Sequence, residues 1–441
     1  MRTSALRALL AAALAAPAAA GAQGVVGEGA GSLEERVGAL GDALGSRLEA
    51  SSPLLAEVAR RVRISGSASF VWFDAEGDAQ VCCEHQQVWD ARFFVDVLLA
   101  ENLGPGEAIW LRSAAASFEW NLIRLGRRDD DLGETYLELQ GIGDSPWLNV
   151  QLGRFQIPVG ENYLRFSKGA RDNPFISNTV SGAWWWDDGV KLYGSDARSR
   201  FGYVASLSNG ETPRDFGLED GDQYTLKLFA NPAAWLHLSV SGLYSGRMGD
   251  DETPAEAALW LGESWARGFG SPSPIPNFAD GGSIPDGPGR LRSTVYLGAD
   301  AVLTHPAGVR LWLSYGNYEI DSSGPGSYDR RLHGWIAELV LEGRLATPEL
   351  RAFYLALRGS GLGSYDREEG YLLDIRTGWT LGYNLRSLEA YSAALGWRVT
   401  KWTTVKVEYT HQRLALVRGA GALRRAADDA DYLGAELVVA F

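Results

Sequence analysis

The sequence predicts an all-β protein: a transmembrane antiparallel β-barrel of about 16 strands, preceded by a short N-terminal amphipathic helix or coiled coil. Apolar and polar residues alternate over successive segments from residue 61 onward, and the connections between these segments are alternately short and long. The composition agrees, because 53 Gly accompany 16 Trp, 17 Tyr and 15 Phe among 441 residues. Disordered chains lack aromatic residues and coiled coils lack Gly, so many short strands joined by turns fit better.

The N-terminus has the pattern of a signal peptide, which we place at residues 1–22. Arg2 and Arg7 precede an apolar stretch over residues 8–16, and small residues lead to a cleavage point before Gln23. The apolar stretch is about half of the ~20 residues that a membrane-spanning helix needs. We therefore predict that the chain is exported and that this segment is removed.

Residues 23–60 predict a short amphipathic helix. Apolar residues recur there at intervals of three and four among charged residues: Leu33, Val37, Leu40, Leu44 and Leu48. The helix has fewer than about four heptads, and the interior residues Gly38, Gly41 and Gly45 weaken a freestanding coiled coil. Two interpretations stay open, a periplasmic coiled coil that oligomerises and a loosely ordered linker.

Residues 61–441 form the predicted barrel domain. The last strand shows the alternation most clearly, with one face made of Leu433, Ala435, Leu437, Val439 and Phe441. Because successive side chains of a strand point to opposite faces, one face suits hydrocarbon and the other suits water. Sixteen segments have this pattern: 61–73, 88–100, 108–124, 132–142, 147–155, 188–196, 199–208, 223–231, 236–241, 292–303, 309–319, 330–343, 349–358, 389–399, 405–409 and the C-terminal strand.

The connections between these segments fit the same architecture. Short ones fall at 143–146, 231–234 and 400–401, and long ones at about 156–187, 247–290 and 359–388. An even number of strands with short periplasmic turns and long external loops is typical of outer-membrane barrels. Three tryptophans each open the strand after a short turn, which predicts an aromatic girdle at the membrane boundary: Trp147, Trp235 and Trp402.

Residues 150–211 resemble the phosphate-selective porins of Gram-negative outer membranes, the O/P-type family. The resemblance is carried by Leu152-Gly153-Arg154-Phe155 with Pro158 and Gly160, by Asp188-Gly189-Val190-Lys191-Leu192-Tyr193-Gly194, and by Ser208-Asn209-Gly210-Glu211. It extends more faintly through Tyr365-Asp366 to Phe441. The resemblance implies a trimeric channel of sixteen strands whose third loop folds inward and narrows the pore. It does not by itself imply phosphate as the solute.

The third long loop contains the candidate constriction and solute-binding residues. Arg165, Lys168 and Arg171 outnumber Glu161 and Asp172 between residues 156 and 187, a cationic surplus that could select anions in a constriction. Solvated loop charges are the alternative interpretation.

The same loop ends in the tripeptide Trp184-Trp185-Trp186. Its rings could stack on the apolar faces of sugars at a pore mouth, or could anchor the loop to the wall or sit in the lipid interface.

Inward-facing positions of the predicted strands mix both signs of charge. The cations assigned there are Arg63, Arg92, Lys227, Arg310, Arg351, Arg398 and Lys406. The carboxylates are Asp96, Glu138, Asp300, Glu338 and Glu408. Neither sign dominates, which favours a weakly selective pore over a dedicated anion channel.

Other chemistry has little support in the sequence. A formal net charge of -14 opposes nucleic-acid binding. Cys82-Cys83 favours a vicinal disulfide or an ordinary loop pair over a metal site with His85. No nucleophile elbow, HExxH or phosphate-cradling motif occurs, so we predict no enzyme activity, no metal and no cofactor. His237 beside Ser239 is the weak candidate for an outer-membrane barrel enzyme acting on lipids.

These observations predict an outer-membrane porin that forms a water-filled channel for passive diffusion of small hydrophilic solutes, with a possible bias toward anions such as phosphate. The expected partners are outer-membrane lipids, small hydrophilic solutes or inorganic anions, and two further copies in a homotrimer. Two alternatives stay open: the lipid-acting barrel enzyme, and a secreted carbohydrate-binding β-protein that uses the tryptophan cluster.

Overall fold

The computed structural model describes residues 57–58, 60–76, 87–105, 108–124, 127–128, 132–161, 173–177, 179, 186–209, 223–245, 290–323, 330–365, 385–416 and 430–440. The chain divides into two units, Met1–Arg60 and Arg61–Phe441. In the first unit Glu57, Val58 and Arg60 are helical. The predicted signal peptide and most of the predicted helix, together with Cys82 and Cys83, lie outside the described residues.

The second unit is one β-sheet of 17 strands. Their bounds are β1 Val62–Glu76, β2 Gln87–Leu103, β3 Leu111–Arg124, β4 Arg127–Arg128, β5 Leu132–Gln140, β6 Asn149–Gln156, β7 Trp186–Ser195, β8 Phe201–Ser208, β9 Gln223–Ala233, β10 Leu236–Ser245, β11 Arg290–His305, β12 Val309–Ser323, β13 Arg330–Glu342, β14 Phe353–Ser364, β15 Leu385–Arg398, β16 Thr403–Leu416 and β17 Ala430–Ala440. The two-residue β4 pairs with the end of β3 on the side where β5 also pairs, so β4 and β5 occupy one position in the wall. The wall therefore has the 16 positions that the sequence predicts.

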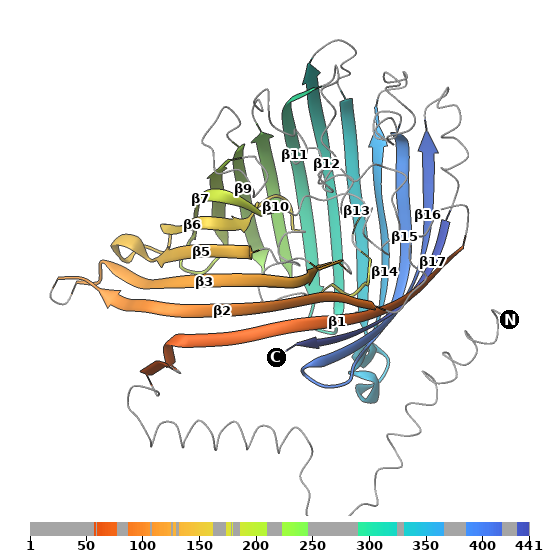
Figure 1. Ribbon diagram of the computed structural model, residues 1–441, viewed down its shortest axis with the longest axis horizontal. Helices are drawn as coiled ribbons and strands as arrows, with labels where there is room; N and C mark the ends of the chain where they lie inside the picture. The colour runs from red at the N-terminus through yellow and green to blue at the C-terminus, as the bar shows by residue number, and fades with distance from the viewer. Residues whose placement is uncertain are drawn as a thin grey trace, which may run out of the picture. The chain divides into compact units, whose positions relative to one another are not determined.

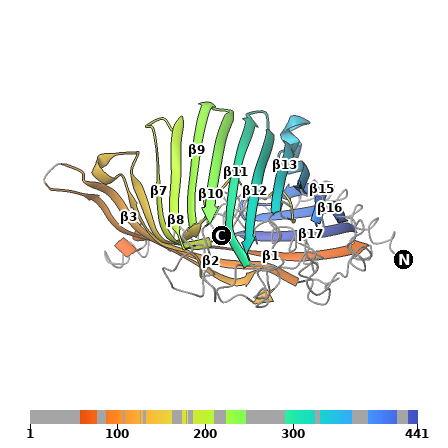
Figure 2. The same cartoon turned by 90° about the horizontal axis from the view of Figure 1, so that it is seen from above.

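The sheet closes on itself. Each wall strand pairs antiparallel with its neighbour in sequence, and β1 pairs with β17 from Ser67 opposite Ala440 to Glu76 opposite Asp431. Figure 1 shows the first strand, in orange-red, beside the last, in dark blue. Figure 2, turned by 90°, shows the sheet curving from β2 and β3 through β9 toward β15–β17. Closure gives the backbone groups of both terminal strands a partner.

Side chains alternate across the wall as the sequence predicts. On β10, Val240 is 50% exposed on the outer face, whereas its neighbours Ser239 and Ser241 are buried on the inner face. On β16, Tyr409 is exposed and Glu408 is buried. The outer face is therefore apolar and the inner face polar over most of the ring. Among the described residues, no helix is long and apolar enough to cross a membrane.

The expected interfacial tryptophans occupy one rim of the ring. Trp147, Trp235 and Trp402 are all exposed, and each follows a short turn. On the same rim the rings of Phe353 and Trp397 stack with centroids 5.7 Å apart. Aromatic rings at a common level fit a boundary between hydrocarbon and water.

Two local expectations are corrected. The turn predicted at 231–234 lies at 234–235, because β9 continues to Ala233. The backbone N–H of Asn231 donates to the Arg200 carbonyl at 2.7 Å. Arg351, predicted to face the lumen, instead ends a 3₁₀ turn over Pro348–Leu350. Pro348 favours the start of a helical turn, so β14 begins only at Phe353.

Placing a charge on the outer face tests the apolar character of the wall. Val240→Arg should lower the free energy of unfolding in lipid vesicles by about 2–4 kcal/mol if the position lies near the bilayer midplane. Val240→Leu is the matched control and should behave as the wild type. Urea titration of the vesicle-embedded protein measures both variants. An arginine variant as stable as the leucine variant would mean that this face meets water.

Candidate functional site

The loop between β6 and β7 enters the barrel from one rim. Its described residues are 157–161, 173–177 and 179. Ile157, Val159, Phe175 and Ile176 are at most 2% exposed, although the inner wall around them is polar. The inward fold that the porin resemblance implies for this loop is therefore present at both described ends. We call residues 157–179 the lumen loop.

The first end of the lumen loop is fixed to β9 and β10. The Lys227 ammonium on β9 donates to the Gly160 carbonyl at 2.7 Å and lies 2.6 Å from the Glu161 carboxylate. On β10, the Ser239 hydroxyl donates to Glu161 at 2.6 Å and His237 Nε2 lies 2.8 Å from the same oxygen. The Glu161 carboxylate thus contacts three polar side chains of the wall, from Lys227, His237 and Ser239.

The surroundings of Glu161 keep it ionised. Burial by itself would raise the pKa of this loop carboxyl, but the hydrogen bond from His237 and the positive charge of Lys227 lower it to about 2. A carboxylate that is charged at neutral pH and paired with a buried ammonium holds the loop without a net local charge.

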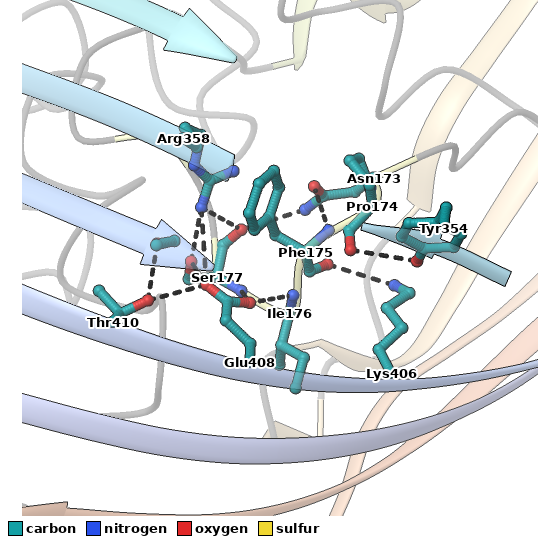
Figure 3. A network of polar contacts seen from close by, with 11 residues as sticks. Asn173, Pro174, Phe175, Ile176, Ser177, Tyr354, Arg358, Lys406, Glu408 and Thr410 are labelled. Carbon is teal, nitrogen blue, oxygen red and sulfur yellow. Dashed lines mark hydrogen bonds and ion pairs between the residues drawn. The ribbon is translucent and has the colours of Figure 1, made fainter. Parts of the chain in front are cut away.

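The second end of the lumen loop is fixed to β14 and β16 (Figure 3). The buried Glu408 carboxylate on β16 accepts the backbone N–H groups of Ile176 and Ser177 and the Ser177 hydroxyl. Arg358 on β14 donates to the Ser177 carbonyl at 3.0 Å, and Lys406 on β16 donates to the Phe175 carbonyl at 3.2 Å. Wall charges of both signs therefore satisfy the polar backbone of the loop, with the carboxylate taking N–H groups and the cations taking carbonyls.

An apolar contact completes this end. The Phe175 side chain packs with Val340, Tyr354, Ala356 and Ala394 from three strands. The Arg358 guanidinium lies 4.1 Å from the centre of the Phe175 ring. Small alanines on the inner face leave room for the ring, so the loop fills a gap in the wall.

The two anchors lie on different parts of the ring. The first anchor uses β9 and β10. The second uses β14 and β16 for its polar contacts and reaches β13 through the packing of Phe175 on Val340, so β11 and β12 lie between the two anchors in the wall. The two described ends of the lumen loop are therefore held by two separate regions of the inner face.

The predicted site residues fall largely outside these anchors. Arg165, Lys168, Arg171, Trp184 and Trp185 lie outside the described residues. Trp186 is the first residue of β7 and pairs through its backbone with Gln156. The roles assigned to all six as constriction or solute-binding residues stay predictions.

The sequence pattern predicts that three residues that hold the loop face inward, but it does not predict that they bind the loop. Lys227, Lys406 and Glu408 face inward as predicted. Arg358 belongs to the same network but is not among the inward-facing cations that the sequence analysis names. His237 and Ser239 both contact Glu161, so the pair suggested for lipid hydrolysis anchors the loop. Within the described part of the chain, no group of three or more His, Cys, Asp or Glu side chains could hold a metal ion.

Comparison with solved structures identifies the fold as that of the outer-membrane porins. No family model matches the chain, and no curated protein matches it in sequence. The outer membrane channel DcaP of Acinetobacter baumannii matches 86% of this chain and 97% of its own, with a TM-score of 0.54 at 10% identity. OmpT of Vibrio cholerae in its trimer form matches 86% and 99%, with a TM-score of 0.53 at 12% identity. The anion-selective porin from Comamonas acidovorans matches 86% and 99%, with a TM-score of 0.51 at 10% identity.

At these identities the likeness establishes the fold. The chain is a porin-type barrel of 16 strands. The resemblance of residues 150–211 to the phosphate-selective O/P type stays a prediction.

Glu408→Ala tests the second anchor. The change would leave Arg358 buried without its carboxylate and two loop N–H groups without their acceptor, a loss of about 3–5 kcal/mol for a broken buried pair. The backbone amides of residues 175–177 should then exchange with deuterium at least about a hundredfold faster, measured by mass spectrometry on the refolded protein.

Glu389→Ala is the matched control, because Glu389 lies on the outer face and its carboxylate accepts from Tyr391 at 2.9 Å. This variant should leave exchange in the lumen loop unchanged. Equal exchange in Glu408→Ala and the wild type would contradict the anchor.

Proposed function

We propose that the protein is an outer-membrane porin that forms a water-filled channel for passive diffusion of small hydrophilic solutes. The observation that carries the proposal is the lumen loop, which is held by opposite charges on two separate regions of the inner wall of a closed barrel. A loop that is bound to the inner wall at both ends can narrow the passage through the barrel, and it needs no helix or strand of its own to do so. The porin fold, the apolar outer face and the predicted signal peptide support a place in the outer membrane.

A bias toward anions is the finer part of the proposal. In the sequence, the three cations Arg165, Lys168 and Arg171 outnumber the two carboxylates Glu161 and Asp172. In the structure, Glu161 is paired with Lys227, so its charge is compensated from the wall. The cationic surplus of the loop is therefore larger than the sequence count suggests. One structural neighbour is described as an anion-selective porin, which agrees with this direction.

We also propose a homotrimer in the outer membrane. The support is the trimer form described for OmpT of Vibrio cholerae, whose barrel this chain resembles. Outer-membrane lipids would then cover the part of the apolar outer face that neighbouring copies leave open. No cofactor enters the proposal.

Planar-bilayer recording tests the channel directly. The refolded full-length protein should produce discrete ion-permeable steps, which appear in groups of three if a trimer inserts as a unit. Protein denatured before addition is the control for leakage. Folded protein that inserts and yet gives no steps would contradict the proposed channel.

Lys168→Glu tests the charge preference. Replacing one cation of the lumen loop by an anion should move the reversal potential in a salt gradient toward the value expected for cations. Lys401→Glu carries the same charge change on an exposed short turn, where Lys401 lies 4.6 Å from the Trp402 ring, and should have a much smaller effect. Equal shifts in the two variants would contradict a selective role for Lys168.

A further inference from the structure

A cavity of about 200 Å³ lies at the rim of the barrel that carries the short turns. Its lining comes from the β11–β12 and β13–β14 turns, from the strand ends beside these turns and beside the β15–β16 turn, from Val438 on β17, and from Asn173 and Pro174 of the lumen loop. The volume is below the roughly 300–1,000 Å³ of pockets that hold drug-sized ligands. The cavity therefore suits a solute smaller than a drug-sized ligand.

Positive charge predominates in the lining. Arg310, Arg344, Arg398 and Lys406 line the cavity, and among the described lining residues Glu342 is the only carboxylate. Arg310 and Lys406 also have carboxylate partners on the inner wall, in Glu338 and Glu436. The surplus of positive charge in the lining is therefore concentrated on Arg344 and Arg398.

Arg344 and Arg398 share a single carboxylate. Arg344 Nε lies 2.6 Å from one oxygen of Glu342, and an Arg398 nitrogen lies 3.7 Å from the other. The second distance is well beyond the ~2.7–2.9 Å of a charge-assisted hydrogen bond. Both side chains are more than 40% exposed. Two guanidinium groups, each with five N–H donors in a planar fork, thus stand around one carboxylate at an open rim.

The rest of the lining is mixed: Asn173, Thr304, His305 and Thr404 are polar, and several other residues are apolar. Pro174, Val340, Tyr354 and Val438 all face the cavity. The Tyr354 hydroxyl donates to the Pro174 carbonyl at 3.1 Å, so this hydroxyl is engaged in holding the loop. The lining therefore combines a carboxylate-binding pair of arginines with apolar and aromatic surface.

We propose that this cavity binds small organic acids, namely a carboxylate on a compact apolar or aromatic body, as they pass the short-turn mouth. The proposal rests on the proposed channel function, because the solute reaches the cavity through the lumen or from the mouth. Arg344 and Arg398 bind the carboxylate, and Val340, Tyr354 and Pro174 contact the apolar body. Glu342 competes with the solute for the same two guanidinium groups.

Calorimetric titration of the refolded full-length protein with benzoate tests the site. Binding should saturate, and Arg344→Gln and Arg398→Gln should each weaken it by about tenfold or more, because each removes a charge-assisted contact. Glu342→Gln should strengthen binding, because it removes the competing carboxylate. Arg112→Gln is the matched control: Arg112 is an exposed arginine paired with Asp144 at 2.8 Å beside another short turn, and its loss should leave binding unchanged.

Three further probes separate charge from shape. Benzyl alcohol keeps the aromatic body without the charge, while acetate and inorganic phosphate keep a charge without that body, so all three should bind more weakly than benzoate. Equal binding of benzyl alcohol would overturn the role of the arginines, and equal binding of acetate or phosphate would overturn the role of the apolar lining. Absence of saturable benzoate binding would overturn the site itself.

The calorimetry tests the organic-acid site and the bilayer recording tests the channel, so a negative result in one leaves the other proposal standing. A protein that conducts ions but does not bind benzoate retains the proposed channel and loses the organic-acid site. A protein that binds benzoate in detergent but does not conduct retains a binding cavity and loses the proposed channel, and with it the idea that the solute is in transit. Gel mobility before and after heating shows in each variant that the barrel has folded.

Discussion

The pairing of β1 with β17 is the constraint on which the other features depend. A strand edge in hydrocarbon would leave N–H and C=O groups without partners, so a sheet can be embedded there only as a ring. Successive side chains of a strand point to opposite faces of the sheet, so once the ring is closed they point alternately out of the barrel and into it. Val240 and Tyr409 lie on the outer face, and Ser239 and Glu408 lie on the inner one. The apolar belt and the charged interior are thus two consequences of one closure.

Closure also creates a problem that the lumen loop solves. Charges directed inward by the pleat are costly when they lose water without gaining partners. Glu408 lies on the inner wall and is fully buried, and it accepts from loop N–H groups, a loop hydroxyl and the wall hydroxyl of Thr410. Arg358 and Lys406 bind loop carbonyls in the same region. The mixed signs of the wall, which the sequence analysis relates to a weakly selective pore, serve here to bind both kinds of polar backbone group.

The two anchors differ in character, and the difference bears on transport. At β9 and β10 the loop contributes a carboxylate, Glu161, to a cationic wall, so charge is neutralised locally. At β14–β16 the loop contributes backbone groups and the Phe175 ring, while the wall supplies the charges. Beyond the second anchor, toward the short turns, Arg344 and Arg398 share one carboxylate. The electrostatic character therefore differs between parts of the inner face, which a single net charge for the pore would hide.

The sequence by itself determined the barrel. Alternation within each strand is local, so the 16 wall positions, the tryptophans after the short turns and the inward placement of Lys227, Lys406 and Glu408 could all be predicted. The wrong prediction that Arg351 faces the lumen also has a local cause, because Pro348 begins a short helical turn before the strand. Only the tertiary structure decided what the inward charges bind. The contacts between Ile176 and Glu408 and between Tyr354 and Pro174 join residues separated by 232 and 180 positions. No periodicity along the chain encodes such pairs, because they exist only once the ring has closed and the loop has entered it.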